Sequence, residues 1–226
     1  MNTVSRRTCA LAGTVIAPLW LGVTALLTWL EWDYIRSVGW APTTENEVPY
    51  PSVLLRGDYG LVQSANFVVT GALVAVFALG LRREFRHRIS GWVATAGFAV
   101  FALGTVMNAG TTDLGDEPST MSGTVHVTGF VLVLIGALFA YPAAGLALRG
   151  NPDWRRWRLL GWWPVLLIAV AFTNLGLPGD LGFCVFVAFL WVWYALMSSH
   201  LLALARAGSE RPDAAPLPNA EAPGLL

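Results

Sequence analysis

The sequence contains no lysine, so all 14 of its basic side chains are arginines, and charged residues make up only 12% of its 226 residues. Apolar residues make up 55%, and the mean hydropathy is +0.58. An ordinary water-soluble domain carries about twice this share of charge. The shortage of charge excludes a soluble globular domain and predicts a membrane protein.

Cysteine and histidine are also scarce, with 2 and 3 copies. Cys9 and Cys184 fall at opposite ends of predicted helices, too far apart for a disulfide. The histidines are isolated, so we expect no metal site, no haem and no other cofactor. The chain also lacks a Gly-rich phosphate loop and a G-x-S-x-G motif. The arginines are spread over several loops rather than gathered in one patch, which argues against nucleic-acid binding.

Long apolar runs are abundant, and about 20 apolar residues suffice to cross the hydrocarbon core of a bilayer. In lipid, backbone polar groups must be paired internally, so runs of this length are read as helices. We therefore predict an all-α integral membrane bundle of six transmembrane helices within residues 1–206, and a disordered cytoplasmic tail, 207–226. The predicted helices span about residues 9–30, 60–81, 89–109, 124–148, 159–177 and 181–205.

The arginines predict the orientation of this bundle, because positive charge gathers in cytoplasmic loops. With six helices, all arginines except Arg36 and Arg56 fall on one side, which places both termini in the cytoplasm of a multi-pass protein of the cell membrane. Most of the 11 tryptophans are interpreted as belt residues at the membrane interfaces, with Trp154 and Trp157 as examples.

Polar side chains within the predicted helices gather in the outer half of the bundle. One face of the second helix carries Gln63, Asn66 and Thr70 at i, i+3 and i+7, and the other outer residues are Glu31, Asn108, His126 and Asn174. Intramembrane polar residues usually face the bundle interior or water, so we predict that they share one outward-facing polar chamber with Asp113.

The same residues also fit purely structural roles, without any ligand. Gln63 and Asn66 are also suited to hydrogen bonds between helices, which need no ligand. A loop carboxylate near the interface would satisfy His126. In "DLGDE", Gly115 and Pro118 break the turn that would align the carboxylates, which favours a solvated loop over a metal site.

The motifs "NFVVTGALVAVFALGLRR" and "SGTVH", with Asp113 between them, give the chain a family resemblance. Residues 8–206 resemble the bacterial membrane proteins grouped as domain of unknown function 998. The resemblance depends chiefly on Asn66, Gly71, Asp113, Gly123 and His126. The family name implies no activity, and the predicted outer loop at 33–59 matches no pattern of the family.

Two classes of function fit these observations. The first is an integral membrane enzyme that acts on a lipid-like substrate, such as a prenyl or terpenoid chain, by carboxylate-mediated proton transfer leading to cyclisation or isomerisation. A carboxylic acid at an apolar boundary has a raised pKa, which suits it to proton transfer. Small multi-pass terpene cyclases are similar in size and helix content, an analogy of architecture only.

The candidate catalytic residues are Glu31, Asp33, Asp113 and His126, and the candidate substrate-binding residues are Trp32, Gln63, Asn66, Asn108 and Asn174. The expected partners are membrane lipids and a hydrophobic small molecule. The alternative is a non-catalytic transporter, sensor or accessory subunit of unknown ligand. A transporter normally places polar access on both sides of the membrane, and the predicted inner half is nearly free of polar residues.

Overall fold

The structure is a computed structural model that describes residues 5–40, 51–114, 117–157, 163 and 181–209. Within these ranges the chain is all-α and contains no strand. The elements are α1 (Arg6–Leu30), α2 (Trp32–Ser37), η1 (Ser52–Arg56), α3 (Gly60–Arg82), α4 (Arg88–Met107), α5 (Met121–Ala147), η2 (Pro152–Trp154) and α7 (Leu181–Ser209).

Five of these helices are long and apolar enough to cross a membrane: Arg6–Leu30, Gly60–Arg82, Arg88–Met107, Met121–Ala147 and Val187–Ala207. The protein is therefore an all-α, multi-pass membrane protein. The predicted helix at 159–177, which carries Asn174, lies almost entirely outside the described residues. Helix α7 continues to Ser209, so the first residues of the predicted tail are helical.

Side-chain caps mark where several of these helices begin. The Ser5 hydroxyl accepts a hydrogen bond from Thr8 N at 3.1 Å at the start of α1. The Thr120 hydroxyl accepts one from Gly123 N at 3.0 Å at the start of α5. Such caps satisfy backbone N–H groups that have no partner within the helix, which fixes the first turn.

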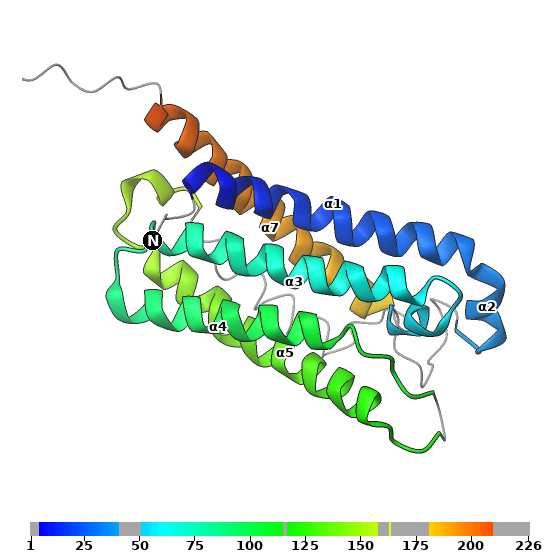
Figure 1. Cartoon of the computed structure of the whole chain (residues 1–226). Helices are drawn as coiled ribbons and strands as arrows, with labels where there is room; N and C mark the ends of the chain where they lie inside the picture. The colour runs from blue at the N-terminus through cyan, green and yellow to red at the C-terminus, as the bar shows by residue number, and fades with distance from the viewer. Residues whose placement is uncertain (1–4, 41–50, 115–116, 158–162, 164–180, 210–226) are drawn as a thin grey trace, which may run out of the picture.

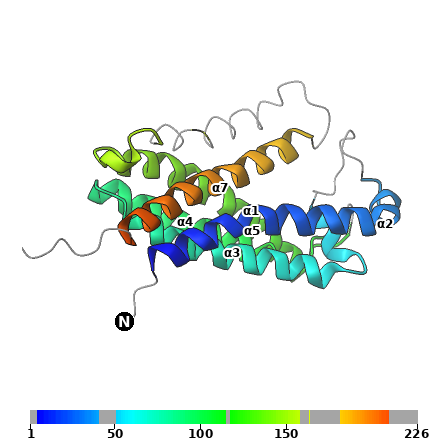
Figure 2. The ribbon, with the colours of Figure 1, turned by 90° about the horizontal axis from the view of Figure 1, so that it is seen from above.

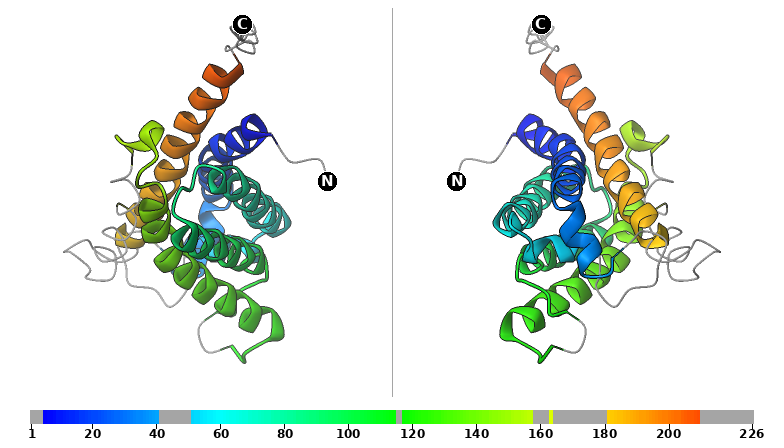
Figure 3. Two further views of the ribbon diagram at one scale, coloured as in Figure 1. Left: turned by 90° about the vertical axis from the view of Figure 1, so that its left-hand side faces the viewer. Right: turned by 90° about the vertical axis from the view of Figure 1, so that its right-hand side faces the viewer.

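The long helices lie side by side (Figure 1), with α1 packed on both α3 and α7, and α4 packed on both α3 and α5. The view from above shows α7 beside α1 (Figure 2). Helix α2 and η1 lie at one end of the bundle, where α1 ends and α3 begins (Figure 3). We call this end the His126 end and the opposite end, at the α3–α4 turn, the Glu84 end.

Aromatic rings fill the interior of the bundle. The rings of Tyr141, Trp193 and Tyr194 are fully buried and pack with one another, and with Phe98 and Phe101, at centroid distances of 4.7 to 6.4 Å. Aromatic pairs at such distances contribute packing energy beyond the area that they bury. Phe101 belongs both to this core and to the lining of the cavity described below.

The belt interpretation of Trp154 is wrong, because its side chain is fully buried at the Glu84 end. Its indole N–H donates to Glu84 Oε2 at 3.1 Å. The second carboxylate oxygen of Glu84 forms a 2.7 Å ion pair with Arg6. An ion pair with arginine and a hydrogen bond from an indole N–H thus accompany a buried carboxylate, although Oε1 accepts no hydrogen bond within the described residues. The sequence pattern did not single out Glu84.

Candidate functional site

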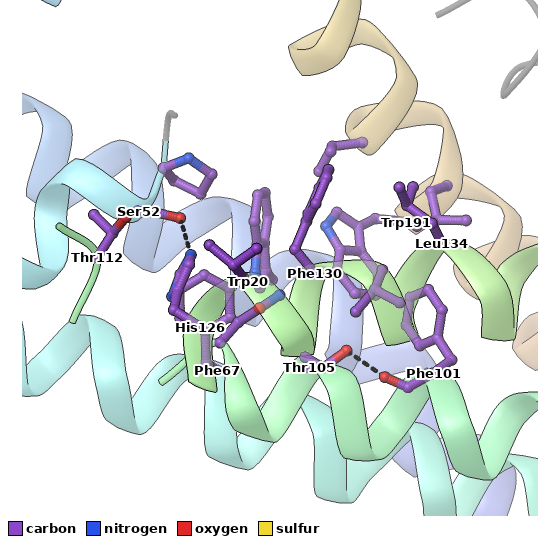
Figure 4. A pocket seen from close by; sticks show the side chains of 16 residues that line it. Trp20, Ser52, Phe67, Phe101, Thr105, Thr112, His126, Phe130, Leu134 and Trp191 are labelled. Carbon is purple, nitrogen blue, oxygen red and sulfur yellow. Dashed lines mark hydrogen bonds between the residues drawn. The ribbon is translucent and has the colours of Figure 1, made fainter. Parts of the chain in front are cut away.

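The candidate site is centred on His126, which lies in the first turns of α5 and is only 4% exposed. Its Nδ1 is 2.8 Å from the carbonyl oxygen of Gly110, and its Nε2 is 2.7 Å from Ser52 Oγ. A carbonyl oxygen can only accept, so Nδ1 carries the hydrogen. In the neutral ring Nε2 is then the acceptor and the Ser52 hydroxyl donates to it (Figure 4). This arrangement suits His126 to act as a base towards a hydroxyl group.

Ser52 is 74 residues from His126 in the sequence and is brought to it by η1. The apolar residues that follow it in η1, Val53 and Leu54, are fully buried in a small cluster with Leu27, Ile35 and Trp40. This cluster holds η1 against α1 and α2, with Ser52 turned towards α5.

A salt bridge ties the other end of η1 to the α4–α5 loop. Both oxygens of Glu117 accept hydrogen bonds from the guanidinium of Arg56, with Nη2–Oε1 at 3.1 Å. The side-chain hydrogen bond from Arg56 lowers the pKa of Glu117. A hydrogen bond from the backbone N–H of Leu114 lowers this pKa further. Arg56 therefore connects the last residue of η1, whose first residue is Ser52, to the α4–α5 loop.

A cavity of about 210 Å³ extends from the Ser52–His126 pair into the bundle. It is mainly apolar, and residues from η1 and all five long helices line it (Figure 4). Its polar lining residues are Ser52, Thr105, Asn108, Thr112 and His126, and its apolar ones are Trp20, Pro51, Phe67, Phe101, Val127, Phe130, Val133, Leu134, Val187, Leu190 and Trp191.

Three lining residues carry a buried polar atom without a hydrogen-bond partner in the described part of the chain. They are the indole nitrogens of Trp20 and Trp191 and the amide oxygen Oδ1 of Asn108. Buried polar groups are normally hydrogen-bonded, since leaving one unpaired costs about 1–3 kcal/mol. The two N–H donors and the oxygen are therefore suited to a bound molecule or ordered water.

Glu31, the leading catalytic candidate from the sequence, is buried but does not line the cavity. Its Oε1 accepts a 2.6 Å hydrogen bond from Tyr59 N, the N-cap residue of α3. Burial raises the pKa of Glu31, and this effect is larger than the lowering caused by the hydrogen bond from Tyr59 N. The negative charge of Asp58 also raises this pKa. A Cβ at Gly57 would collide with the carboxylate, so the loop closes tightly over it.

Gln63, Asn66 and Thr70 share a buried face of α3, as the spacing predicts. Asn66 Nδ2 donates to the carbonyl of Trp20 at 3.4 Å and to Gln63 Oε1 at 3.3 Å. It is therefore an interhelical contact between α3 and α1, and neither Asn66 nor Gln63 is a lining residue of the cavity. Gln63 Nε2, Asn66 Oδ1 and Thr70 Oγ1 are buried with no hydrogen-bond partner among the described residues.

Asp113 hydrogen-bonds Thr120, the N-cap residue of α5, and is not a lining residue of the cavity. Its carboxylate accepts from Thr120 N at 2.9 Å and from Thr120 Oγ1 at 2.7 Å. The hydrogen bond from the Thr120 side chain is the main reason that the pKa of Asp113 is lowered. Asp33 and Trp32 are exposed on α2.

The structure thus brings together only part of the predicted chamber. Asn108 and His126 line one cavity, whereas Glu31, Asp33 and Asp113 are not among its lining residues, and Asn174 lies outside the described residues. Among the residues described, no three His, Cys, Asp or Glu side chains form a group that could hold a metal ion.

Sequence reasoning missed Ser52, Trp20 and Trp191. Ser52 lies in the loop between predicted helices, where no periodicity shows which side chain faces a helix. Trp20 and Trp191 resemble any other tryptophan of an apolar run until packing shows that their N–H groups are unpaired. The short apolar segment "SVLL" next to Pro51 is the signal that could have indicated a packed η1.

A family model described as "Protein of unknown function (DUF998)" matches residues 11–205. Comparison with curated proteins and with solved structures finds no significant match. The residues that carry the resemblance have clear structural positions. A Cβ at Gly123 would collide with the carboxylate of Asp113, and a Cβ at Gly71 would lie 2.7 Å from the carbonyl oxygen of Ala102 on α4. Because the family model matches most of its length, the chain belongs to the DUF998 family, and it is a multi-pass membrane protein.

Proposed function

We propose that this protein is an integral membrane enzyme that transfers a proton to or from a lipid-like substrate, such as a prenyl or terpenoid chain. The observation that carries the proposal is the Ser52–His126 pair at the polar end of a mainly apolar cavity. An apolar cavity with a few placed polar groups is the usual form of a small-molecule site.

His126 takes the role that the sequence suggested for a carboxylate. Glu31, Asp33 and Asp113 are not lining residues of the cavity, whereas Nε2 of His126 is at its edge. A neutral imidazole is a base, and it is too weak an acid to protonate an alkene. The arrangement therefore favours isomerisation over cyclisation started by alkene protonation: His126 removes a C–H proton that lies next to a carbonyl group of the substrate and returns a proton to another carbon.

The predicted orientation completes the proposal. With both termini cytoplasmic in the cell membrane, the His126 end and its cavity lie on the outer side. A substrate that reaches the cavity then comes from the outer leaflet or from outside the cell.

The test uses deuterium uptake, which can be measured before the substrate is identified. Membranes containing the protein are incubated in D₂O with a lipid extract of the organism that encodes it, and the lipids are analysed by mass spectrometry. A proton-transfer enzyme introduces solvent deuterium into one lipid species. His126→Gln should lower this labelling about 10²-fold or more, as removal of a general base does. Ser52→Ala should also lower it.

Ser199→Ala is a matched control, because Ser199 is exposed on α7, does not line the cavity, and its hydroxyl donates to the carbonyl of Ala195. It should leave the labelling unchanged. Absence of protein-dependent labelling, with lipid nevertheless bound by the purified protein, would contradict the enzyme proposal.

Lipid binding without deuterium labelling is the result expected for the alternative, a non-catalytic transporter, sensor or accessory subunit. One observation favours it: within the described ranges no carboxylate lines the cavity, so His126 and Ser52 would carry all the chemistry. The same cavity would then serve as a binding site alone.

A further inference from the structure

A second pocket lies at the Glu84 end, on the turn between α3 and α4. Its volume is about 190 Å³, and its lining residues are Arg82, Phe85, Arg86, His87, Arg88, Gly91 and Trp92. Three arginines and a histidine therefore surround one small space, and none of its lining residues within the described ranges is acidic. It lies at the opposite end of the bundle from His126.

The carboxylate of this turn, Glu84, is turned away from the pocket. It is 3% exposed and engaged by Arg6 and by the indole N–H of Trp154. In the described part of the chain, the ion pairs are Arg6–Glu84 and Arg56–Glu117, so Arg82, Arg86 and Arg88 are left without an anionic partner. Like charges gathered in one pocket repel one another unless an anion joins them.

The pocket is also held in shape by contacts of the turn with α5. The backbone N–H groups of Arg86 and His87 both donate to the carbonyl of Ala147, at 2.9 and 3.3 Å. Asn151 Nδ2 donates to the carbonyl of Glu84 at 3.0 Å. The guanidinium of Arg82 lies 3.7 Å from the centroid of the Trp92 ring, a cation–π contact that fixes its position.

Exposed apolar residues adjoin the arginines in the first turns of α4. Ile89 is 74% exposed and Trp92 is 54% exposed. An arginine guanidinium binds phosphate oxygens in a bidentate manner, and basic pockets at the ends of transmembrane helices suit anionic head groups. Arginines with apolar surface beside them match a molecule that has both a phosphate and acyl chains.

We propose that this pocket binds the phosphate of an anionic phospholipid head group. The chemistry that it recognises is a phosphate-bearing anion, and the exposed apolar residues favour the lipid over a soluble phosphate. This site is independent of the Ser52–His126 site and of its proposed reaction.

The test is a lipid titration of the purified full chain in detergent, followed by native mass spectrometry. Dioleoylphosphatidylglycerol and dioleoylphosphatidylcholine have the same acyl chains and differ in net charge. The wild-type protein should bind the anionic lipid more tightly. The double variant Arg82→Gln/Arg88→Gln should lose about fivefold in affinity for each arginine removed and keep its weak affinity for phosphatidylcholine.

Arg83→Gln is the matched control, because Arg83 is an exposed arginine of the same turn that does not line the pocket. It should bind the anionic lipid as the wild type does. If the double glutamine variant unfolds, Arg82→Lys/Arg88→Lys replaces it, with a smaller loss expected because lysine cannot bind bidentately.

Three outcomes decide the proposal. Equal affinity of the wild type for the two lipids would overturn it, and so would an equal loss in Arg83→Gln and in the double variant. Displacement of phosphatidylglycerol by millimolar sodium phosphate, with the same dependence on Arg82 and Arg88, would assign the site to a soluble phosphate. That result would overturn the proposal of a lipid site.

Discussion

At the scale of single residues, Glu84 shows how this protein buries a charge. Its carboxylate has an indole donor at 3.1 Å and an arginine at 2.7 Å. Glu84→Ala leaves the Trp154 N–H buried without an acceptor, which costs about 1–3 kcal/mol. Thermal unfolding in detergent should show a midpoint lowered by several degrees, since about 1 kcal/mol shifts it by about 2–4 °C at this chain length.

Glu84→Gln is the matched comparison, because glutamine keeps an oxygen that the Trp154 N–H can reach. Its midpoint should fall less than that of Glu84→Ala. Equal midpoints for Glu84→Ala and the wild type would show that the bond to Trp154 contributes nothing to stability.

Glu31 makes stability depend on pH in the direction opposite to most carboxylates. Burial raises its pKa above the usual value of 4.5, so between about pH 4.5 and the raised pKa the folded state binds more protons than the unfolded state. Its contribution to the free energy of unfolding therefore falls as pH rises through that window. Asp113 and Glu117, whose pKa values are lowered, contribute stability that is lost at low pH.

Comparison of Glu31→Gln with the wild type isolates this contribution, because the other carboxylates are common to both. The variant should gain stability relative to the wild type as pH rises above about 4.5, with the amide still accepting from Tyr59 N. The measurement is the unfolding midpoint of both proteins across the acidic to neutral range. A difference that is constant over this range would contradict the raised pKa.

The sequence indicates which polar residues are buried better than it indicates what they contact. Asn66, Asn108 and His126 stand out because a polar side chain within an apolar run must find a partner. The partners cannot be inferred in the same way. Ser52 meets His126 only because a loop packs back across the helix ends, and Gly110 contributes a backbone carbonyl that any residue would have.

At the scale of elements, the contact between α4 and α5 depends on glycine. A Cβ at Gly104 would lie 2.5 Å from the carbonyl oxygen of Gly129, and one at Gly97 would lie 2.7 Å from Ala140 N. Both neighbours are backbone atoms, which cannot move without separating the helices. Small residues that let helix backbones approach are the usual basis of packing in membranes.

Gly104→Ala should therefore destabilise the protein by about 1–3 kcal/mol, as overpacking of a tight contact does. Gly22→Ala is the matched control, because a Cβ at Gly22 on α1 meets nothing within 4 Å. That change should be neutral or stabilising by up to about 1 kcal/mol, since alanine favours the helix. Unfolding midpoints of the two variants in the same detergent make the comparison, and equal effects would contradict the close contact.

The long helices could be predicted from the sequence because each needs about 20 apolar residues to span the bilayer. Their ends were less predictable, since α1 begins at Arg6 and α5 at Met121, where polar caps rather than apolar residues set the start. Helix α2 and η1 lie in a stretch with no clear period. Their positions depend on tertiary contacts of Ile35, Val53 and Leu54.

At the scale of the whole molecule, the two ends of the bundle differ in charge although the net charge is zero. Arg82, Arg83, Arg86 and Arg88 lie at the Glu84 end, together with Arg6. The His126 end has the carboxylates of Glu31, Asp58, Asp113 and Glu117, with Arg56 paired to Glu117. A molecule polarised in this way has one strongly preferred orientation in a membrane.

The arginine-rich Glu84 end should face the cytoplasm, because positive charge near helix ends is retained on that side. Reporters fused after Leu81, Leu148 and Ala205 should therefore be cytoplasmic, and those after Trp40 and Asp116 external.

Cysteine labelling of the full chain is an independent check of this orientation. In a background with Cys9→Ser and Cys184→Ser, a membrane-impermeant maleimide should label the exposed position of Ser119→Cys in intact cells. It should label Arg83→Cys, also an exposed position, only after permeabilisation. Labelling of Arg83→Cys in intact cells would reverse the orientation, and with it the outer location of the His126 cavity.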